Sequence, residues 1–357
     1  MGSIMLVLKT SIRSPVGLHF SPCGAGLLVF SGSVVQVWPD WLNEPARPAV
    51  KTGGALERAA LGPGAGHAVL YLSGNSRTKL LDVATGKVSE SVVPSGGPAW
   101  PHFGAAGGFV ISSHNRGKLS RFEYDPAHAD VLREVWQIDR RGGKGGKSHI
   151  GTHYRFGDVC GATGVFVGLE YRNGGSEPFD ALAVRAVADG ALVSREVLKA
   201  PEYNRLLSKA GLTLSIHPSG RYFAHPDGKT VCFRKLSGKA PDPVELPELV
   251  DAPTKTKPKP KPKAKIAKGA TRATPKPKPA APPKRECESV AFSPDGAFLL
   301  AGRADGAVTL FDTNTWEPVR TLDWRVGPLR AVRFAPDGTR AAAVGTKGKV
   351  VVWDVDV

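Results

Sequence analysis

Near the C-terminus, apolar residues alternate with small or polar ones in short runs that end at turn residues. Val290 and Phe292 alternate with smaller residues, which is typical of a half-buried strand. Proline presets φ and glycine accepts positive φ, so Pro294-Asp295-Gly296 and Asp305-Gly306 predict tight turns. The remaining apolar runs predict three more strands of the same antiparallel unit, at 298–301, 308–311 and 319–322.

This unit is repeated once more at the end of the chain. The sequence Phe-Ser-Pro-Asp-Gly around Pro294 returns as Phe-Ala-Pro-Asp-Gly around Pro336, and the two prolines are 42 residues apart. The third strands end on Phe311-Asp312 and Trp353-Asp354. A period near 40 with these motifs resembles the WD-repeat family of β-propellers, in which each repeat builds one four-stranded blade.

Weaker copies of the unit precede these two. They lie at 18–38, 59–87, 100–124, 154–193 and 214–233. With seven copies, the resemblance implies an all-β, seven-bladed propeller of four-stranded antiparallel blades. The seventh copy ends on a third strand at 350–355, so we predict that Met5–Lys9 supplies its fourth strand. That pairing closes the ring and covers an edge that would otherwise be exposed.

Composition narrows the class of protein. The 357 residues include 42 Gly, 30 Pro and 2 Met, which favours short strands and turns over long helices. No run approaches the roughly 18 apolar residues that span a bilayer, and the first residues lack the features of a secretion signal. The four cysteines lie far apart and form neither a metal-ligand pair nor a disulfide framework. We therefore expect a cytoplasmic protein without a membrane span.

The net charge of +16 is concentrated in one segment. Residues 254–285 contain ten Lys, two Arg and no acidic residue, which leaves +4 for the rest of the chain. Alternating Lys and Pro favours an extended, disordered segment. We predict that 1–253 and 286–357 form one propeller, interrupted by this basic insertion between blades five and six.

Two interpretations of the insertion stay open. It is either a soluble spacer or an arm that binds a polyanion, with Lys257, Lys259, Lys261 and Lys263 as candidate contacts. The segment contains no aromatic residue on which bases could stack. Binding to nucleic acid would therefore be independent of sequence and sensitive to salt.

The segment 141–148 approaches a phosphate-binding loop, with Gly146-Lys147-Ser148 in place but Arg141 where the first glycine belongs. The residues that follow do not predict the helix that such a loop requires. His149 and His153 would suit a metal only on a helix. We therefore predict a basic loop between blades, no metal or cofactor, and no enzymatic activity.

Propeller topology predicts where basic side chains gather. Loops between blades and turns between second and third strands emerge on the same face, so we expect a basic face there. Its candidate residues are Arg77, His114, Arg116, Lys118, Lys144, Lys147, Arg172, Arg303, Lys347 and Lys349. In the alternative, acidic neighbours such as Asp227 and Asp305 cancel this charge.

These observations favour a monomeric, non-catalytic scaffold that presents loops on a rigid ring to an acidic protein partner. The alternative is a protein that binds the phosphate backbone of nucleic acid through the Lys/Pro arm. The sequence does not name the partner.

Overall fold

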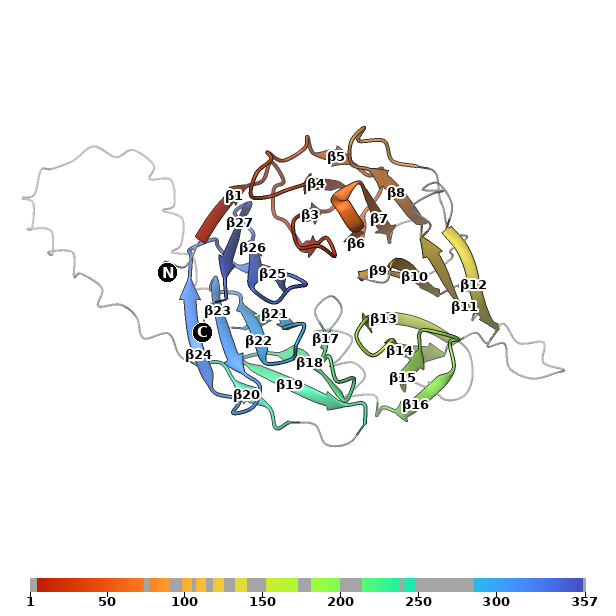
Figure 1. Cartoon of the computed structure of the whole chain (residues 1–357). Helices are drawn as coiled ribbons and strands as arrows, with labels where there is room; N and C mark the ends of the chain where they lie inside the picture. The colour runs from red at the N-terminus through yellow and green to blue at the C-terminus, as the bar shows by residue number, and fades with distance from the viewer. Residues whose placement is uncertain are drawn as a thin grey trace, which may run out of the picture.

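Seven antiparallel sheets stand around a common centre in the computed structural model (Figure 1). The structure describes residues 5–73, 77–89, 98–104, 107–113, 118–124, 132–139, 152–172, 181–199, 214–237, 241–247 and 286–355. Over these residues the fold contains β-strands and one short 3-10 helix, η1 (Pro63–Ala65). The prediction of an all-β, seven-bladed propeller is confirmed. None of the helical segments in these ranges is long and apolar enough to cross a membrane.

Each sheet is one blade, with its first strand nearest the centre of the ring (Figure 1). Blade 1 contains β2 (Gly17–Phe20), β3 (Leu27–Ser31), β4 (Val34–Trp38) and β5 (Val50–Lys51). Blade 2 contains β6 (Leu56–Leu61), β7 (His67–Leu72) and β8 (Arg77–Asp82). Blade 3 contains β9 (Ala99–Gly104), β10 (Gly107–Ser113), β11 (Lys118–Tyr124) and β12 (Leu132–Asp139).

The second half of the ring follows the same plan. Blade 4 contains β13 (Thr152–Cys160), β14 (Val165–Arg172), β15 (Ala181–Ala186) and β16 (Leu192–Val197). Blade 5 contains β17 (Ser215–Ile216), β18 (Tyr222–Asp227), β19 (Thr230–Lys235) and β20 (Val244–Glu245). Blade 6 contains β21 (Cys287–Phe292), β22 (Phe298–Arg303), β23 (Ala307–Asp312) and β24 (Pro318–Asp323). Blade 7 contains β25 (Leu329–Phe334), β26 (Arg340–Gly345), β27 (Lys349–Asp354) and β1 (Met5–Lys9).

Blade 2 departs from the four-stranded pattern. Its sheet has three strands among the described residues, and an isolated antiparallel bridge joins Leu81 to Val88 where a fourth strand would begin. The other six sheets have four strands each.

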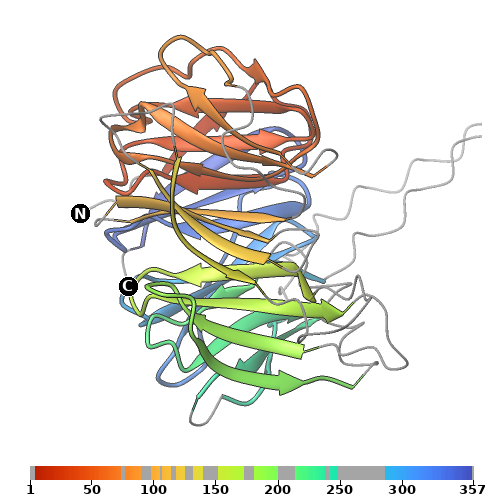
Figure 2. The same ribbon diagram turned by 90° about the vertical axis from the view of Figure 1, so that its right-hand side faces the viewer.

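The N-terminal strand closes the ring as predicted. β1 pairs antiparallel with β27, from Met5 opposite Trp353 to Lys9 opposite Lys349. In Figure 2 the two ends of the chain lie on the same side of the ring, as this register requires. The outer edge of β27 is therefore covered by a strand from the other end of the chain.

The hydrophobic core lies between neighbouring blades. One buried cluster joins Leu27 and Val29 of blade 1 to Val344 and Val350 of blade 7, and others join blade 1 to blade 2 and blade 6 to blade 7. Alternate side chains of each strand supply these contacts, because successive side chains point to opposite faces of a sheet. Each blade is therefore held by its two neighbours, and the ring positions the turns at its two faces.

Candidate partner-binding surface and central channel

The turns between second and third strands lie on one face of the ring, which we call the linker face. Strand direction alternates within each blade, so the third strand begins and the fourth strand ends at this face. The chain then passes to the next blade on the same side, for example from Lys9 at the end of β1 to Gly17 at the start of β2. Side chains at these turns therefore lie on the same face, although they belong to different blades.

Besides Lys349, which is described below, three of the predicted basic residues lie at the linker face with described side chains. Arg77 begins β8 and is exposed, and Lys347 is exposed in the turn before β27. Lys118 begins β11, is half-buried and donates to Gln137 Oε1 at 2.8 Å. None of the three has a carboxylate within 4.0 Å among the described residues. Arg172 ends β14 at the same face.

Arg303 lies at the same turn position but is buried. It is 1% exposed, and it donates to the carbonyl oxygen of Pro247 at 2.6 Å and to the carboxylate of Asp305. Contrary to the expectation of a free positive charge, this arginine matches the alternative in which Asp305 cancels it. Burial of the guanidinium is tolerated because both partners accept its hydrogen bonds.

The other predicted contacts lie outside the described residues. They are His114, Arg116, Lys144, Lys147, Lys257, Lys259, Lys261 and Lys263, together with the segments 141–148 and 254–285. Their contribution to a basic face or arm stays a prediction.

The structure also places Lys9, which sequence reasoning missed, beside the predicted residues Lys347 and Lys349. Lys9 and Lys349 lie directly opposite each other at the end of the β1–β27 pair, and both are exposed beside Lys347. No described carboxylate lies within ion-pair distance of these three lysines. Like charges directly opposite each other in a sheet are destabilising. Only the register of the closing strand reveals this cluster.

A channel with a cavity of about 1110 Å³ runs through the centre of the ring. The first strands of all seven blades contribute to its wall. Its ionisable side chains include His19, Arg58, His102, Asp158 and Arg333, which come from five different blades. Within the described residues, no three His, Cys, Asp or Glu side chains are arranged to hold a metal ion.

The two histidines of the channel are neutral at pH 7. Burial lowers the pKa of His19 to about 3, and His102 and Arg333 nearby add to this effect. His19 Nδ1 accepts a hydrogen bond from the backbone N–H of Leu61 at 3.2 Å, which leaves the proton of the neutral ring on Nε2. Burial also lowers the pKa of His102 to about 4. Both rings are therefore polar but uncharged groups of the wall.

Asp158 shows the opposite shift. Burial raises its pKa to about 6, although Arg333, the backbone N–H of Val159 and Arg58 favour the charged form. The carboxyl group is mostly ionised at pH 7 and becomes neutral as the pH falls below about 6. Its charge therefore changes within about one pH unit of neutrality.

Sequence position explains why some of these groups converge. His19, His102 and Arg333 each directly precede a phenylalanine of a first strand, namely Phe20, Phe103 and Phe334. Equivalent positions of different repeats meet at the axis of a ring. This common position in the repeats is the signal by which the sequence could have identified them.

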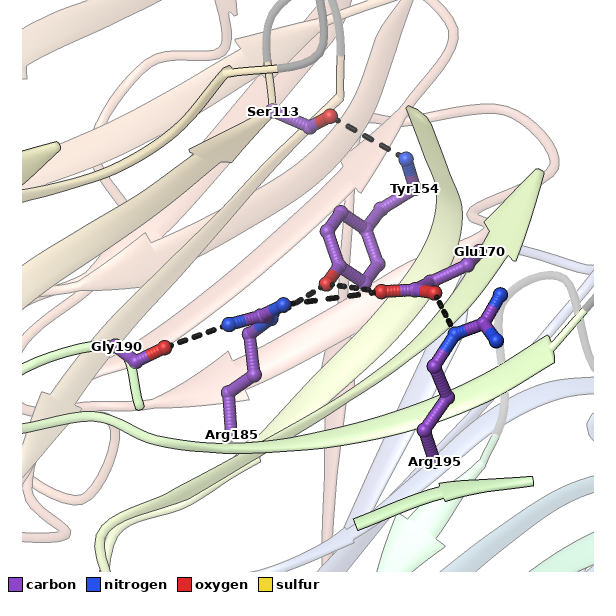
Figure 3. Close-up of polar contacts among 6 residues, drawn as sticks. All are labelled: Ser113, Tyr154, Glu170, Arg185, Gly190 and Arg195. Atoms are coloured by element: carbon purple, nitrogen blue, oxygen red, sulfur yellow. Dashed lines mark hydrogen bonds and ion pairs between the residues drawn. The ribbon is translucent and has the colours of Figure 1, made fainter. Parts of the chain in front are cut away.

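A buried polar network crosses blade 4 (Figure 3). The fully buried carboxylate of Glu170 accepts from Tyr154 Oη at 2.8 Å and from Arg195 Nε at 2.7 Å. Arg185, which is 5% exposed, donates to Tyr154 Oη and to the carbonyl oxygen of Gly190, each at 2.7 Å. Every charged group here has partners, so the network positions strands rather than offering a free binding group.

Comparison with known proteins finds repeats of one family. The sequence model of the family "WD domain, G-beta repeat" matches residues 283–312 and 316–354. "Meiotic recombination protein rec14" of Schizosaccharomyces pombe is 33% identical over 64 residues, 18% of this chain and 21% of that protein. Human "Serine-threonine kinase receptor-associated protein" is 32% identical over 69 residues, 19% of this chain and 20% of that protein.

A third relative is similar over a stretch of the same size. "COMPASS component SWD1" of Saccharomyces cerevisiae is 30% identical over 78 residues, which is 21% of this chain and 18% of that protein. The chain thus spans about a fifth of the length of the curated relatives it matches. These are distant homologues, and the similarity is that of shared repeats.

Proposed function

Because the chain belongs to the WD40-repeat β-propeller family, whose members are usually non-catalytic protein-interaction scaffolds, we propose that it binds an acidic protein partner at the linker face. The contacts are the exposed basic side chains at the turns between second and third strands, with Lys347 and Lys349 at the centre of the site. The ring holds these turns rigidly, so a partner meets a preformed surface.

The observation that carries this proposal is the lysine cluster at the ring closure. Lys9 and Lys349 face each other across the β1–β27 pair, with Lys347 in the adjoining turn. A like-charged pair in this position costs on the order of 0.2–1 kcal/mol. An acidic side chain placed between the lysines removes this repulsion and gains charge-assisted hydrogen bonds. Positive charge at the face also accelerates the encounter with an acidic partner.

The names of two relatives are consistent with a scaffold. One is a component of COMPASS, and another is associated with a serine-threonine kinase receptor. Both names describe proteins that assemble with others. They support the class of function proposed here and do not identify this chain's partner.

Charge reversal at the linker face tests the proposal. The double variant Lys347→Glu/Lys349→Glu is expected to bind a fluorescein-labelled polyglutamate peptide at least about tenfold more weakly than the wild-type full-length protein, because each reversal replaces attraction by repulsion. Fluorescence anisotropy at low ionic strength measures the affinity. The loss is expected to shrink as salt is added, because salt screens exposed charges.

The matched control is Lys87→Glu/Lys235→Glu, which changes the net charge equally at the opposite face. Lys87 follows β8 and Lys235 ends β19, and both are exposed. This control is expected to bind the peptide within about twofold of wild type. Equal losses in the two variants would reject a localised site. If random duplex DNA is bound at the same ionic strength and the peptide is not, binding through phosphates replaces this proposal.

A further inference from the structure

The arginines of the channel wall are paired with carboxylates, with one exception. Three of them form ion pairs: Arg58 with Glu57 at 2.8 Å, Arg121 with Glu123 at 2.7 Å and Arg330 with Glu288 at 3.3 Å. Arg333 donates through one guanidinium nitrogen to the carbonyl oxygen of Val332 at 2.9 Å. Among the described residues no carboxylate lies within 4.0 Å of Arg333. The described residues provide no other partner for its N–H groups, and the side chain lines the cavity.

Asp158 is the matching carboxylate. It lies on β13 of blade 4, and Arg333 lies on β25 of blade 7, across the centre of the ring (Figure 1). The two charges are close enough to influence each other's pKa, yet they form no ion pair within 4.0 Å. Asp337 also lines the cavity and belongs to none of the three ion pairs, but it is exposed at a turn. One cation and one anion thus face each other across the cavity.

Apolar residues line the same cavity. Aromatic residues of the wall include Phe20, Trp100, Phe103, Phe109, Phe292 and Phe334. Small-molecule sites in proteins commonly combine such apolar walls with a few convergent polar groups. A cavity of about 1110 Å³ is large enough for a ligand of this kind.

We propose that the channel binds an amino acid with an aromatic or large apolar side chain, whose carboxylate accepts hydrogen bonds from Arg333 and whose ammonium group donates to Asp158. The apolar side chain of the ligand lies against the aromatic wall. This site faces the channel axis and shares no residue with the lysine cluster of the linker face.

Charge balance favours a zwitterion over a simple anion or cation. A lone carboxylate ligand would pair with Arg333 but would be repelled by ionised Asp158, and a lone amine would be repelled by Arg333 and Arg58. A zwitterion pairs with both charges and brings no net charge into the channel. A guanidinium binds a carboxylate through two parallel hydrogen bonds, which fixes the orientation of the ligand.

Three probes with one molecular skeleton separate these cases. L-phenylalanine carries both charges, 3-phenylpropionate only the carboxylate, and 2-phenylethylamine only the ammonium group. Isothermal titration calorimetry with the full-length protein at pH 7 is expected to show L-phenylalanine binding at least about tenfold more tightly than either single-charge probe, since each charged hydrogen bond contributes about 1.5–3 kcal/mol. Equal affinity for 3-phenylpropionate would overturn the role of Asp158. Absence of heat with L-phenylalanine would overturn the proposal.

Two variants assign the contacts. Asp158→Asn is expected to weaken L-phenylalanine binding at least about tenfold while strengthening 3-phenylpropionate binding, and Arg333→Gln is expected to weaken both. A merely structural effect of Asp158→Asn would weaken both probes alike and would contradict the proposal. Arg333→Lys keeps the charge without the planar fork, so intermediate binding is expected. Thermal unfolding without ligand confirms that each variant is folded.

Lowering the pH is expected to change the affinities for L-phenylalanine and 3-phenylpropionate in opposite directions. The charged groups that act on Asp158 are Arg333 and Arg58, and the titratable side chains of His19 and His102 also line the cavity. The histidines stay neutral between pH 7 and 5.5, because their pKa values are about 3 and 4. Asp158 takes up its proton near pH 6, so L-phenylalanine is expected to bind more weakly at pH 5.5 and 3-phenylpropionate more tightly. Tighter binding of L-phenylalanine at pH 5.5 would overturn the assignment.

Discussion

Replacing Glu170 by glutamine is expected to lower the free energy of unfolding by about 3–5 kcal/mol, the cost of removing one partner from a buried ion pair. Glu170 is fully buried and pairs with Arg195 Nε at 2.7 Å and with Arg185 at 3.9 Å. Glutamine keeps the size of the side chain and removes its charge. The guanidinium groups of Arg185 and Arg195, which lie on either side of Glu170 in Figure 3, then lose their compensating anion.

Urea denaturation followed by circular dichroism measures this effect. The control is Glu44→Gln, which breaks the exposed ion pair between Glu44 and Arg47, whose side chains are each 48% exposed. Exposed pairs contribute about 0–1 kcal/mol, so this variant is expected to unfold near the wild-type midpoint. Similar midpoints for the two variants would show that the blade 4 network does not stabilise the ring.

Deleting residues 1–9 is expected to lower the free energy of unfolding by about 4 kcal/mol. Leu6 and Leu8 of β1 are partly buried against Val350 and Val352, and partial burial of two leucines contributes about 3 kcal/mol. Loss of the β1–β27 ladder removes net hydrogen-bond energy of about 1 kcal/mol. The bared edge of β27 is also expected to promote self-association, which analytical ultracentrifugation detects.

Two point variants distinguish the loss of packing at the ring closure from the effect of shortening the chain. Leu8→Asp places a charge on the packed side of β1 and is expected to cost about 2–3 kcal/mol. Val7→Asp, on the alternate side where Val7 is 44% exposed, is expected to cost less than about 1 kcal/mol. Thermal melts compare the two. If Val7→Asp were the more damaging, the observed register of β1 would be contradicted.

The pairing of the closing strand could be predicted from the sequence alone. An unpaired third strand at the C-terminus and a short apolar run at Met5–Lys9 were sufficient to predict their pairing, because a propeller needs a closed ring. The expected strand at 319–322 lies within β24, Pro318–Asp323. Local alternation and turn residues determine these elements, so they can be predicted without tertiary information.

Other features depended on contacts between distant segments. The turn position of Arg303 indicated a surface cation, yet its side chain folds onto Pro247, 56 residues away. Lys9 and Lys349 become neighbours only through the register of two termini. Asp158 and Arg333 face each other only because blades 4 and 7 lie on opposite sides of the ring. Periodicity in the sequence does not encode such distances.

Hydrogen–deuterium exchange tests most directly whether this propeller is a scaffold that binds acidic partners at the linker face. The full-length protein is measured with and without saturating polyglutamate peptide. Slower exchange is expected at the turn 345–349 and at Lys9 and Thr10, where the peptide covers the lysine cluster. Protection confined to the turns between first and second strands, such as 21–24 and 293–296 on the opposite face, would contradict the account.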